Sequence, residues 1–182
     1  MNILTDVPDD FVVIGNDRIP VHTDFRNWIK IDNILSDKSL SAAEKIKGML
    51  PLCYKRLPDN IGQAFKAMME FYNPDLQRED PRKSSGRQYS FEYDAPYIYS
   101  SFFSEYGIDL QNEAIHWHKF LVLMKGLGDK CVFSRILSIR SMDISDFSGK
   151  QKQIYLRLKR IYALPDTVVE EEKVAAELGN LF

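Results

Sequence analysis

The chain has 182 residues, of which 45% are hydrophobic and 27% charged, a composition that excludes an intrinsically disordered protein. Its 24 basic and 26 acidic residues give a formal net charge of −2, so no overall charge draws it to nucleic acid or an anionic membrane. The first residues lack the features of a signal peptide, and no run approaches the roughly 18 apolar residues of a membrane span. We therefore expect a soluble, cytoplasmic protein.

Residues 1–74 predict a β-hairpin followed by helices. The runs 11–14 and 18–22 are rich in β-branched residues and flank a short loop of Gly, Asn and Asp, which is typical of a hairpin. Ser41 and Glu44 match a capping box at the start of a helix, and apolar residues recur at helical spacing around it. We expect this part to form one α+β unit.

The stretch 75–90 breaks the helical pattern. Between Asp75 and Gln88 the residues are mostly charged or turn-forming, and Leu76 is the only large apolar one. Such a composition is typical of a charged linker or a mobile loop. We expect it to separate the N-terminal unit from a helical unit that follows.

Residues 91–165 predict a C-terminal unit of four helices, so the whole chain is expected to be mainly α. Asp94 can cap the first of these helices, Pro96 fits its first turn, and Gly107 can end it. The acidic residues 166–182 predict a frayed tail or a short helix. Helical spacing assigns two sets of residues to a shared core: Tyr99, Phe102, Phe103, Tyr106, Trp117 and Phe120 on the first two helices, and Ile154, Tyr155, Leu158, Ile161 and Tyr162 on the fourth.

No motif predicts catalytic, cofactor or metal chemistry. His116 and His118 lie two residues apart, and on a helix such residues face different directions, so they are not expected to share a metal ion. Cys53 and Cys131 are single cysteines at apolar positions and are expected to be reduced and buried. Glycine-rich phosphate loops and nucleophile elbows are absent from the sequence. We expect a protein that is not an enzyme and needs no cofactor.

Two basic clusters are the remaining signals. The simplest interpretation is that they form solvated surface without a specific function. The functional alternatives are a patch that binds an acidic protein partner or nucleic acid. Tyr155 and Tyr162 fall on the apolar stripe of the fourth helix, which favours a place in the core over base stacking. The clusters comprise Lys150, Lys152, Arg157, Lys159 and Arg160 on the fourth helix, and Arg78, Arg82, Lys83 and Arg87 in the linker.

Packing motifs carry a family resemblance. They lie at residues 23–28, 94–99, 106–110, 116–120 and 158–164. Together they resemble a family of small bacteriophage proteins known as the "gene product fifteen" family, from siphophages and prophages of Gram-positive bacteria. The resemblance covers most of the chain but leaves the linker and the tail unspecific, and none of its motifs is catalytic.

The resemblance implies a role in phage tail assembly. Members are typically encoded between the major tail protein and the tape-measure protein. This position implies a chaperone that coats and solubilises the long helical tape-measure protein, helps recruit tail-tube subunits in the host bacterial cytoplasm, and is absent from the mature virion. A structural tail component retained in the virion, or a helical regulatory or nucleic-acid-binding protein, are the alternatives. Expected partners are the tape-measure protein, the major tail (tube) protein and further copies of the chain, with no membrane.

The residues left outside the predicted core are the candidates for partner binding. On the expected helices these are the aromatic and basic side chains that the apolar stripes do not use. They are Tyr97, His118, Lys119, Lys159 and Arg160.

Overall fold

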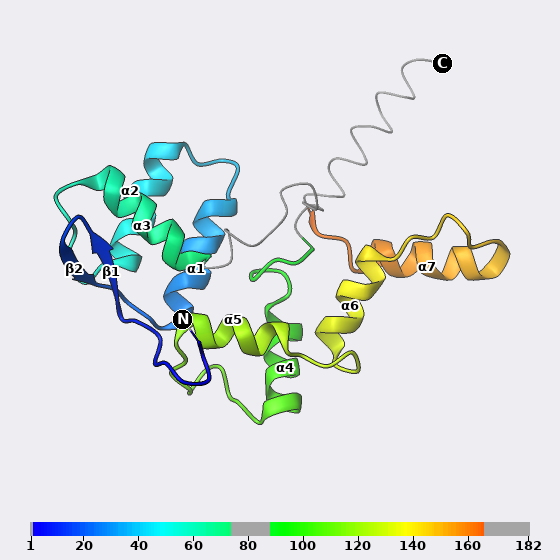
Figure 1. The fold of residues 1–182 in the computed structure, drawn as a ribbon. Helices are drawn as coiled ribbons and strands as arrows, with labels where there is room; N and C mark the ends of the chain where they lie inside the picture. Colours follow the sequence, from blue (N-terminus) through cyan, green and yellow to red (C-terminus); the bar gives the residue numbers. More distant parts are fainter. Residues whose placement is uncertain (1, 74–87, 166–182) are drawn as a thin grey trace, which may run out of the picture. The chain divides into compact units, whose positions relative to one another are not determined.

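A computed structural model describes residues 2–73 and 88–165, which contain one two-stranded antiparallel sheet and seven helices (Figure 1). The predicted fold class, mainly helical with an N-terminal hairpin, is confirmed. Most of the predicted linker 75–90 and the whole predicted tail 166–182 lie outside the described residues. Among the described helices, none combines the length and the apolar character that crossing a bilayer requires.

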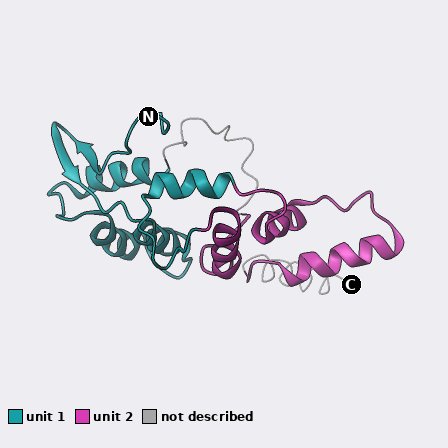
Figure 2. Ribbon diagram, turned by 90° about the horizontal axis from the view of Figure 1, so that it is seen from below, with its two compact units in different colours: residues 1–84, 108–126 teal, residues 85–107, 127–182 magenta. Residues whose placement is uncertain are grey.

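The chain divides into two compact units. Unit 1 comprises residues 1–84 and 108–126, and unit 2 comprises residues 85–107 and 127–182 (Figure 2). This division differs from the predicted one, because residues 108–126 cluster with the N-terminal part of the chain. The four helices expected to share one core therefore belong to two different units.

Unit 1 begins with the predicted hairpin. Strands β1 (Phe11–Ile14) and β2 (Asp17–Pro20) pair antiparallel. Gly15 has a φ of 63° in the connecting turn, a conformation that glycine adopts without steric cost. An isolated hairpin is only marginally stable in water, and β1 packs against helix α3 (Ile61–Tyr72).

The helices of unit 1 have clear local start signals. At α1 (Phe25–Ser36), the Asp24 carboxylate accepts a hydrogen bond from the backbone amide of Arg26. Helix α2 (Ala42–Cys53) starts with the predicted capping box, in which Ser41 and Glu44 satisfy each other's backbone amides. Helices α1 and α2 pack together, and α5 (Trp117–Lys125) packs against α1.

A stack of five buried aromatic rings forms the centre of unit 1. Phe71 lies 4.8 Å from Trp28, Trp28 lies 6.1 Å from Trp117, and Trp117 lies 5.8 Å from Phe120, all between ring centroids. Phe25 completes the series at 4.7 Å from Phe120. Each such pair adds about 0.5–1.5 kcal/mol beyond the burial of its area. The stack joins α1, α3 and α5, three segments far apart in the sequence.

Backbone pairing explains why α5 belongs to unit 1. The amide of Phe25 donates to the carbonyl of Ile115 at 3.0 Å, and the amide of Trp117 donates to the carbonyl of Thr23 at 2.7 Å. The indole Nε1 of Trp117 also donates to the carbonyl of Tyr72 at 2.8 Å. These bonds fix the segment before α5 beside the segment before α1, and so direct Trp117 into the core of unit 1.

The described residues of unit 2 form three helices. Helix α4 (Ala95–Tyr106) packs on α6 (Val132–Ser141), and α6 packs on α7 (Gly149–Ile161). As predicted, Gly107 ends α4, in the left-handed conformation with a φ of 67°. The buried apolar side chains of this unit are Phe91, Ile98, Phe102, Leu127, Cys131, Phe133, Ile136 and Leu164.

Several predicted core positions are wrong in this unit. Phe103 is 56% exposed, Ile154 is 59% exposed and Ile161 is 60% exposed. The helical spacing is present in the structure, but the described part of unit 2 covers only part of each apolar stripe. A buried serine, Ser101, takes part in the core instead, where its hydroxyl accepts a hydrogen bond from the amide of Phe133 at 3.2 Å.

Candidate partner-binding surface

Helix α7 is a basic helix that the protein leaves largely uncovered. None of its 13 residues, Gly149–Ile161, is buried. It carries five basic side chains and no acidic one, although the whole chain is slightly acidic. The basic residues are Lys150, Lys152, Arg157, Lys159 and Arg160.

One side of α7 combines positive charge with exposed apolar side chains. Lys150, Ile154, Arg157 and Ile161 are spaced by four, three and four residues, which places them along one face of a helix. All four are exposed, and we call this set the outer face of α7. Two isoleucines seven residues apart lie about 10 Å from each other along a helix. A surface of this kind is complementary to an acidic segment with an apolar stripe of its own.

The other side of α7 packs within unit 2. The Tyr155 ring lies 5.0 Å from the Phe147 ring, and the Tyr162 ring meets the Tyr97 ring edge-on at 6.2 Å. The Lys159 ammonium donates to the carbonyl of Arg140 at 2.8 Å. These contacts confirm that both tyrosines point toward unit 2. None of them involves a residue of the outer face.

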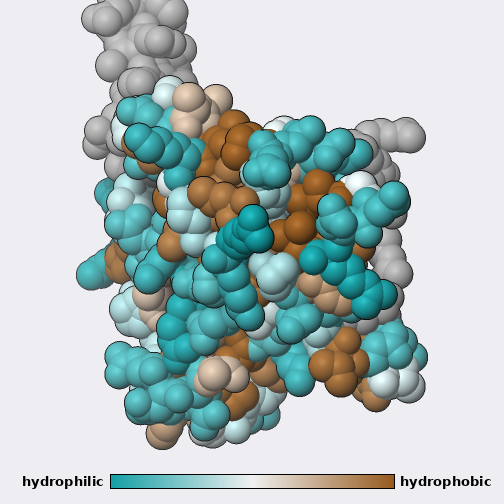
Figure 3. Space-filling view, turned by 90° about the vertical axis from the view of Figure 1, so that its left-hand side faces the viewer, coloured by the Kyte–Doolittle hydropathy of each residue, from teal (hydrophilic) through white to brown (hydrophobic). Residues whose placement is uncertain are grey.

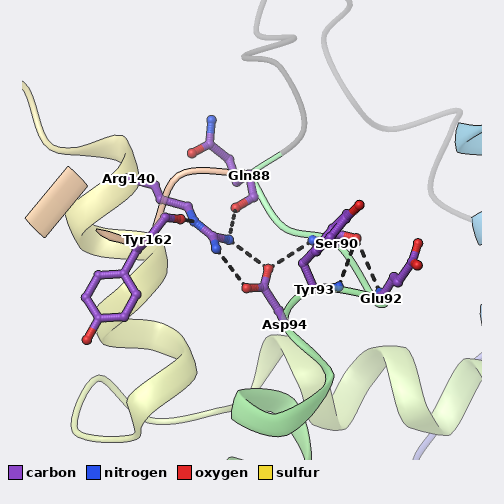
Figure 4. A network of polar contacts seen from close by, with 7 residues as sticks. All are labelled: Gln88, Ser90, Glu92, Tyr93, Asp94, Arg140 and Tyr162. Carbon is purple, nitrogen blue, oxygen red and sulfur yellow. Dashed lines mark hydrogen bonds and ion pairs between the residues drawn. The ribbon is translucent and has the colours of Figure 1, made fainter. Parts of the chain in front are cut away.

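A buried ion pair holds the C-terminal end of α7 (Figure 4). The Arg140 guanidinium, on α6, donates to both carboxylate oxygens of Asp94 at 2.7 Å, and Asp94 is fully buried. The same guanidinium donates to the carbonyl of Tyr162 at 2.6 Å and to that of Gln88 at 3.0 Å. Bidentate pairs of this kind fix orientation as well as supplying energy. Arg140 therefore ties residues before α4 and after α7 to α6.

The role of Asp94 differs from the predicted one. Asp94 does precede α4, with Pro96 in the first turn, but its carboxylate makes no capping hydrogen bond. It accepts from the amide of Ser90 at 3.0 Å and pairs with Arg140 instead. The sequence signals a cap because Asp94 stands just before an apolar helical pattern. The sequence does not indicate that Asp94 pairs with Arg140, which lies 46 residues further along the chain.

The five predicted partner-binding residues fall in both units. His118 and Lys119 belong to unit 1, and Tyr97, Lys159 and Arg160 belong to unit 2. Lys119 and Arg160 are exposed, whereas the other three are partly buried and have contacts within the protein. The two isoleucines of the outer face were missed, because an apolar stripe is normally assigned to the core.

The two histidines lie next to each other at the start of α5. His116 precedes α5 as its N-cap residue, so the two are not both on the helix, and their ring centroids are 5.1 Å apart. His116 Nδ1 accepts from the amide of His118, and its Nε2 donates to the carbonyl of Asp9 at 3.1 Å. His118 Nε2 donates to the carbonyl of Phe71 at 2.8 Å. Burial lowers the pKa of His116, which favours the neutral ring that this bonding requires.

The described residues show no cluster suited to a metal ion. Within residues 2–73 and 88–165, no group of three or more His, Cys, Asp or Glu residues could hold a metal. Cys53 and Cys131 are free and buried, as predicted. Burial raises the pKa of the Cys53 thiol to about 12, so the unreactive thiol form dominates at neutral pH.

Exposed apolar residues in unit 1 are scattered. Figure 3 views the side on which α2 and the hairpin lie in Figure 1, and its apolar areas (brown) are separated by polar ones (teal). Val13, Leu57, Ile61 and Val122 are about half exposed and belong to different segments of the chain. Single exposed apolar residues are common on soluble proteins. The aligned pair on α7 is therefore the more informative feature.

One comparison with known proteins identifies a family. The family model described as "Bacteriophage Gp15 protein" matches residues 6–164, a range that includes all the described helices and strands. No curated protein and no solved structure matches the chain. On the strength of the family match, which covers most of its length, the chain belongs to the bacteriophage Gp15 protein family.

Proposed function

We propose that this phage protein is a non-enzymatic tail assembly chaperone. In this proposal it binds and solubilises the tape-measure protein and helps recruit subunits of the major tail (tube) protein. It acts in the host bacterial cytoplasm and is absent from the mature virion. Family membership supports the phage origin, and the properties of α7 support a role in binding a protein partner.

The outer face of α7 is the observation that carries the proposal. A tape-measure protein is a long helical rod, which before assembly exposes apolar stripes to water. An amphipathic helix binds such a stripe by placing apolar residues at helical spacing against it. Ile154 and Ile161 supply these contacts, and the basic side chains around them select rods with acidic flanks.

The magnitude of the contact favours a reversible chaperone over a permanent joint. Full burial of one large aliphatic side chain contributes about 1.5–3 kcal/mol, and because Ile154 and Ile161 are only 59% and 60% exposed, the two contribute roughly 2–4 kcal/mol. Association itself costs an estimated 4–15 kcal/mol. A single α7 contact is therefore weak, and several copies bound along one rod gain by avidity. Weak individual contacts also allow tube subunits to displace the chaperone.

Co-expression with the tape-measure protein of the same phage tests the proposal. We expect the wild-type chain to increase the soluble fraction of the tape-measure protein and to co-purify with it. The double variant Ile154→Asp/Ile161→Asp should lose both effects, because it places charge where apolar contact is needed. Leu156→Asp is the matched control, because Leu156 is 41% exposed and lies on the same helix but outside the outer face.

Two results would contradict the proposal at different levels. If the wild-type chain neither binds nor solubilises the tape-measure protein, the chaperone function is wrong. If the double variant binds as well as the control, the function stands but α7 is not the binding surface. Mass spectrometry of purified virions separates the chaperone from a retained tail component, since a chaperone is absent from the particle.

Binding to nucleic acid is the second candidate, favoured by the five basic residues of α7. Phosphate contacts make affinity fall steeply with salt, by a slope of about −0.9 per neutralised phosphate on a log–log plot. We expect no such response, because Ile154 and Ile161 interrupt the positive face. A salt-dependent affinity for duplex DNA that Arg157→Glu removes would support this candidate instead.

A further inference from the structure

The outer face of α7 has the spacing of a coiled-coil seam, the line along which one helix packs lengthwise on another. Its residues Lys150, Ile154, Arg157 and Ile161 follow one another by four, three and four positions. Alternation of these two spacings is the repeat by which two helices pack side by side. The two isoleucines occupy one type of seam position, and the two basic residues occupy the other. The seam therefore alternates apolar and basic side chains.

The contacts of α7 within unit 2 use a different side of the helix. Tyr155, Lys159 and Tyr162 are spaced by four and three residues, and each has a contact within unit 2. Each tyrosine follows one of the two isoleucines by one residue, so it points about 100° further around the helix axis. The four residues of the outer face are all exposed. A second helix can therefore lie along the outer face while these contacts remain.

The basic residues of the seam disfavour pairing of α7 with the α7 of a second copy. In a parallel pair, each basic residue faces the same basic residue of the other helix, so that like charges meet at close range. In an antiparallel pair, each basic residue faces an isoleucine, and its charge has no counter-charge within the contact. Helix α7 carries no acidic residue that could offset either cost. The favoured occupant is therefore a helix of different sequence.

We propose that the outer face of α7 binds a helix in which acidic and apolar residues alternate at the same spacing. Acids then lie opposite the two basic residues, and apolar residues lie opposite the two isoleucines. Each charge meets a counter-charge at a position where a single charge is costly to bury. Charged pairs within a seam also fix the register of the two helices. Lys150 and Arg157 are thus the residues that determine specificity, whereas the isoleucines supply apolar contact.

This inference rests on the proposed function, since it states which segments of a tape-measure protein the chain recognises. These are helical segments with acids interspersed among the apolar residues of one stripe. A stripe that is apolar throughout leaves Lys150 and Arg157 without counter-charges, and it is therefore a poorer partner. Selection of this kind places the chaperone at particular segments of the rod.

Synthetic helical peptides, titrated into the isotopically labelled full-length chain and followed by NMR, test the inference. Two probes of about three heptads carry isoleucine at one seam position and glutamate at the other, in the two possible orders, which suit parallel and antiparallel pairing. A control peptide of the same composition has its glutamates outside the seam. We expect one probe to bind about tenfold more tightly than the control, with the shifts concentrated in α7, because close charge pairs couple strongly.

Charge reversal gives a second comparison. Lys150→Glu/Arg157→Glu should bind the glutamate probe about tenfold more weakly than the wild-type chain does, and it should prefer a probe with lysine in place of glutamate. Lys130→Glu/Lys152→Glu is the matched control, because it has the same net charge and changes no residue of the outer face. Its preference should remain that of the wild-type chain. The comparison of peptides on the wild-type chain does not depend on either variant.

Three outcomes would overturn the inference. Equal binding of the probes and the control peptide would mean that charge attraction alone is at work, and absence of binding to both probes would remove the seam. Self-association of the wild-type chain that Ile154→Asp abolishes would show that a second copy occupies the outer face.

The peptide assay contains no tape-measure protein, so it can fail or succeed independently of the chaperone test. If the chain does not bind the tape-measure protein but keeps its preference for the glutamate probe, the chaperone function is wrong and the specificity of α7 stands. If it binds the tape-measure protein through Ile154 and Ile161 without any preference among the peptides, the function stands and the proposed specificity is wrong.

Discussion

The two units differ in the interactions that hold distant segments of the chain together. Unit 1 stacks aromatic rings from α1, α3 and α5, while unit 2 uses a smaller apolar core and the buried pair of Asp94 and Arg140. In aromatic packing, the contribution to stability is divided among many contacts. In a buried ion pair, it depends on only two side chains. The difference implies that unit 2 depends more on single residues than unit 1 does.

The largest effect is expected from breaking the ion pair. Asp94→Ala leaves the Arg140 guanidinium, whose side chain is only 11% exposed, without its counter-charge. Loss of one partner of a buried pair costs about 3–5 kcal/mol. Urea unfolding followed by circular dichroism should show this loss, and hydrogen exchange should show reduced protection in α4 and α6.

A double variant tests whether charge is the cause. Asp94→Ala/Arg140→Met removes both charges and should be more stable than Asp94→Ala alone, because an apolar side chain costs nothing to bury there. The carbonyls of Tyr162 and Gln88 lose their donor, so recovery is expected to be partial. A double variant no more stable than the single one would show that the hydrogen bonds, not the buried charge, dominate.

Trp117→Phe is expected to have an intermediate effect on unit 1. It removes the hydrogen bond to the carbonyl of Tyr72 and part of the stacked surface, at a cost of about 2–3 kcal/mol. Trp28 remains as a fluorescent probe of the same unit. A loss larger than that of Asp94→Ala would invert the expected contrast between the units.

Lys159 and Arg160 separate packing from binding among the predicted site residues. Lys159→Ala should cost about 1 kcal/mol, since its ammonium donates to the carbonyl of Arg140. Arg160 is exposed, and Arg160→Ala should change stability by less than about 0.5 kcal/mol. Thermal unfolding of the two variants measures the difference. Equal losses would mean that the Lys159 contact contributes nothing to the fold.

The smallest expected effect is a pH dependence in unit 1. Burial holds the pKa of His116 below its ordinary value of 6.5, so the unfolded chain binds more protons at mildly acidic pH. The free energy of unfolding should therefore fall as the pH is lowered through 6.5. His116→Asn keeps an oxygen that can cap α5 but does not titrate, and it should flatten the dependence measured by tryptophan fluorescence. An unchanged slope would exclude His116 as its source.

Local signals were predicted well because the residues that produce them are neighbours. The capping box of Ser41 and Glu44, the hairpin turn at Gly15 and the helix end at Gly107 all appear in the structure. Each depends on the backbone geometry of a few consecutive residues, and the types of those residues predict that geometry. The assignment of Ile154 and Ile161 to the core failed, because periodicity identifies an apolar face but not whether another element covers it.

The sequence by itself determined that the chain is mainly helical, begins with a hairpin, and carries a strongly basic helix before an acidic segment. Only the tertiary structure decided which helices share a core. Backbone pairing of Thr23 and Phe25 with Ile115 and Trp117 assigns α5 to unit 1, and the packing of α7 within the described part of unit 2 leaves its outer face exposed. Non-local contacts of this kind depend on how the whole chain returns on itself. Helical propensity and apolar spacing depend on residues that are close in the sequence. They therefore do not predict which distant segments come into contact.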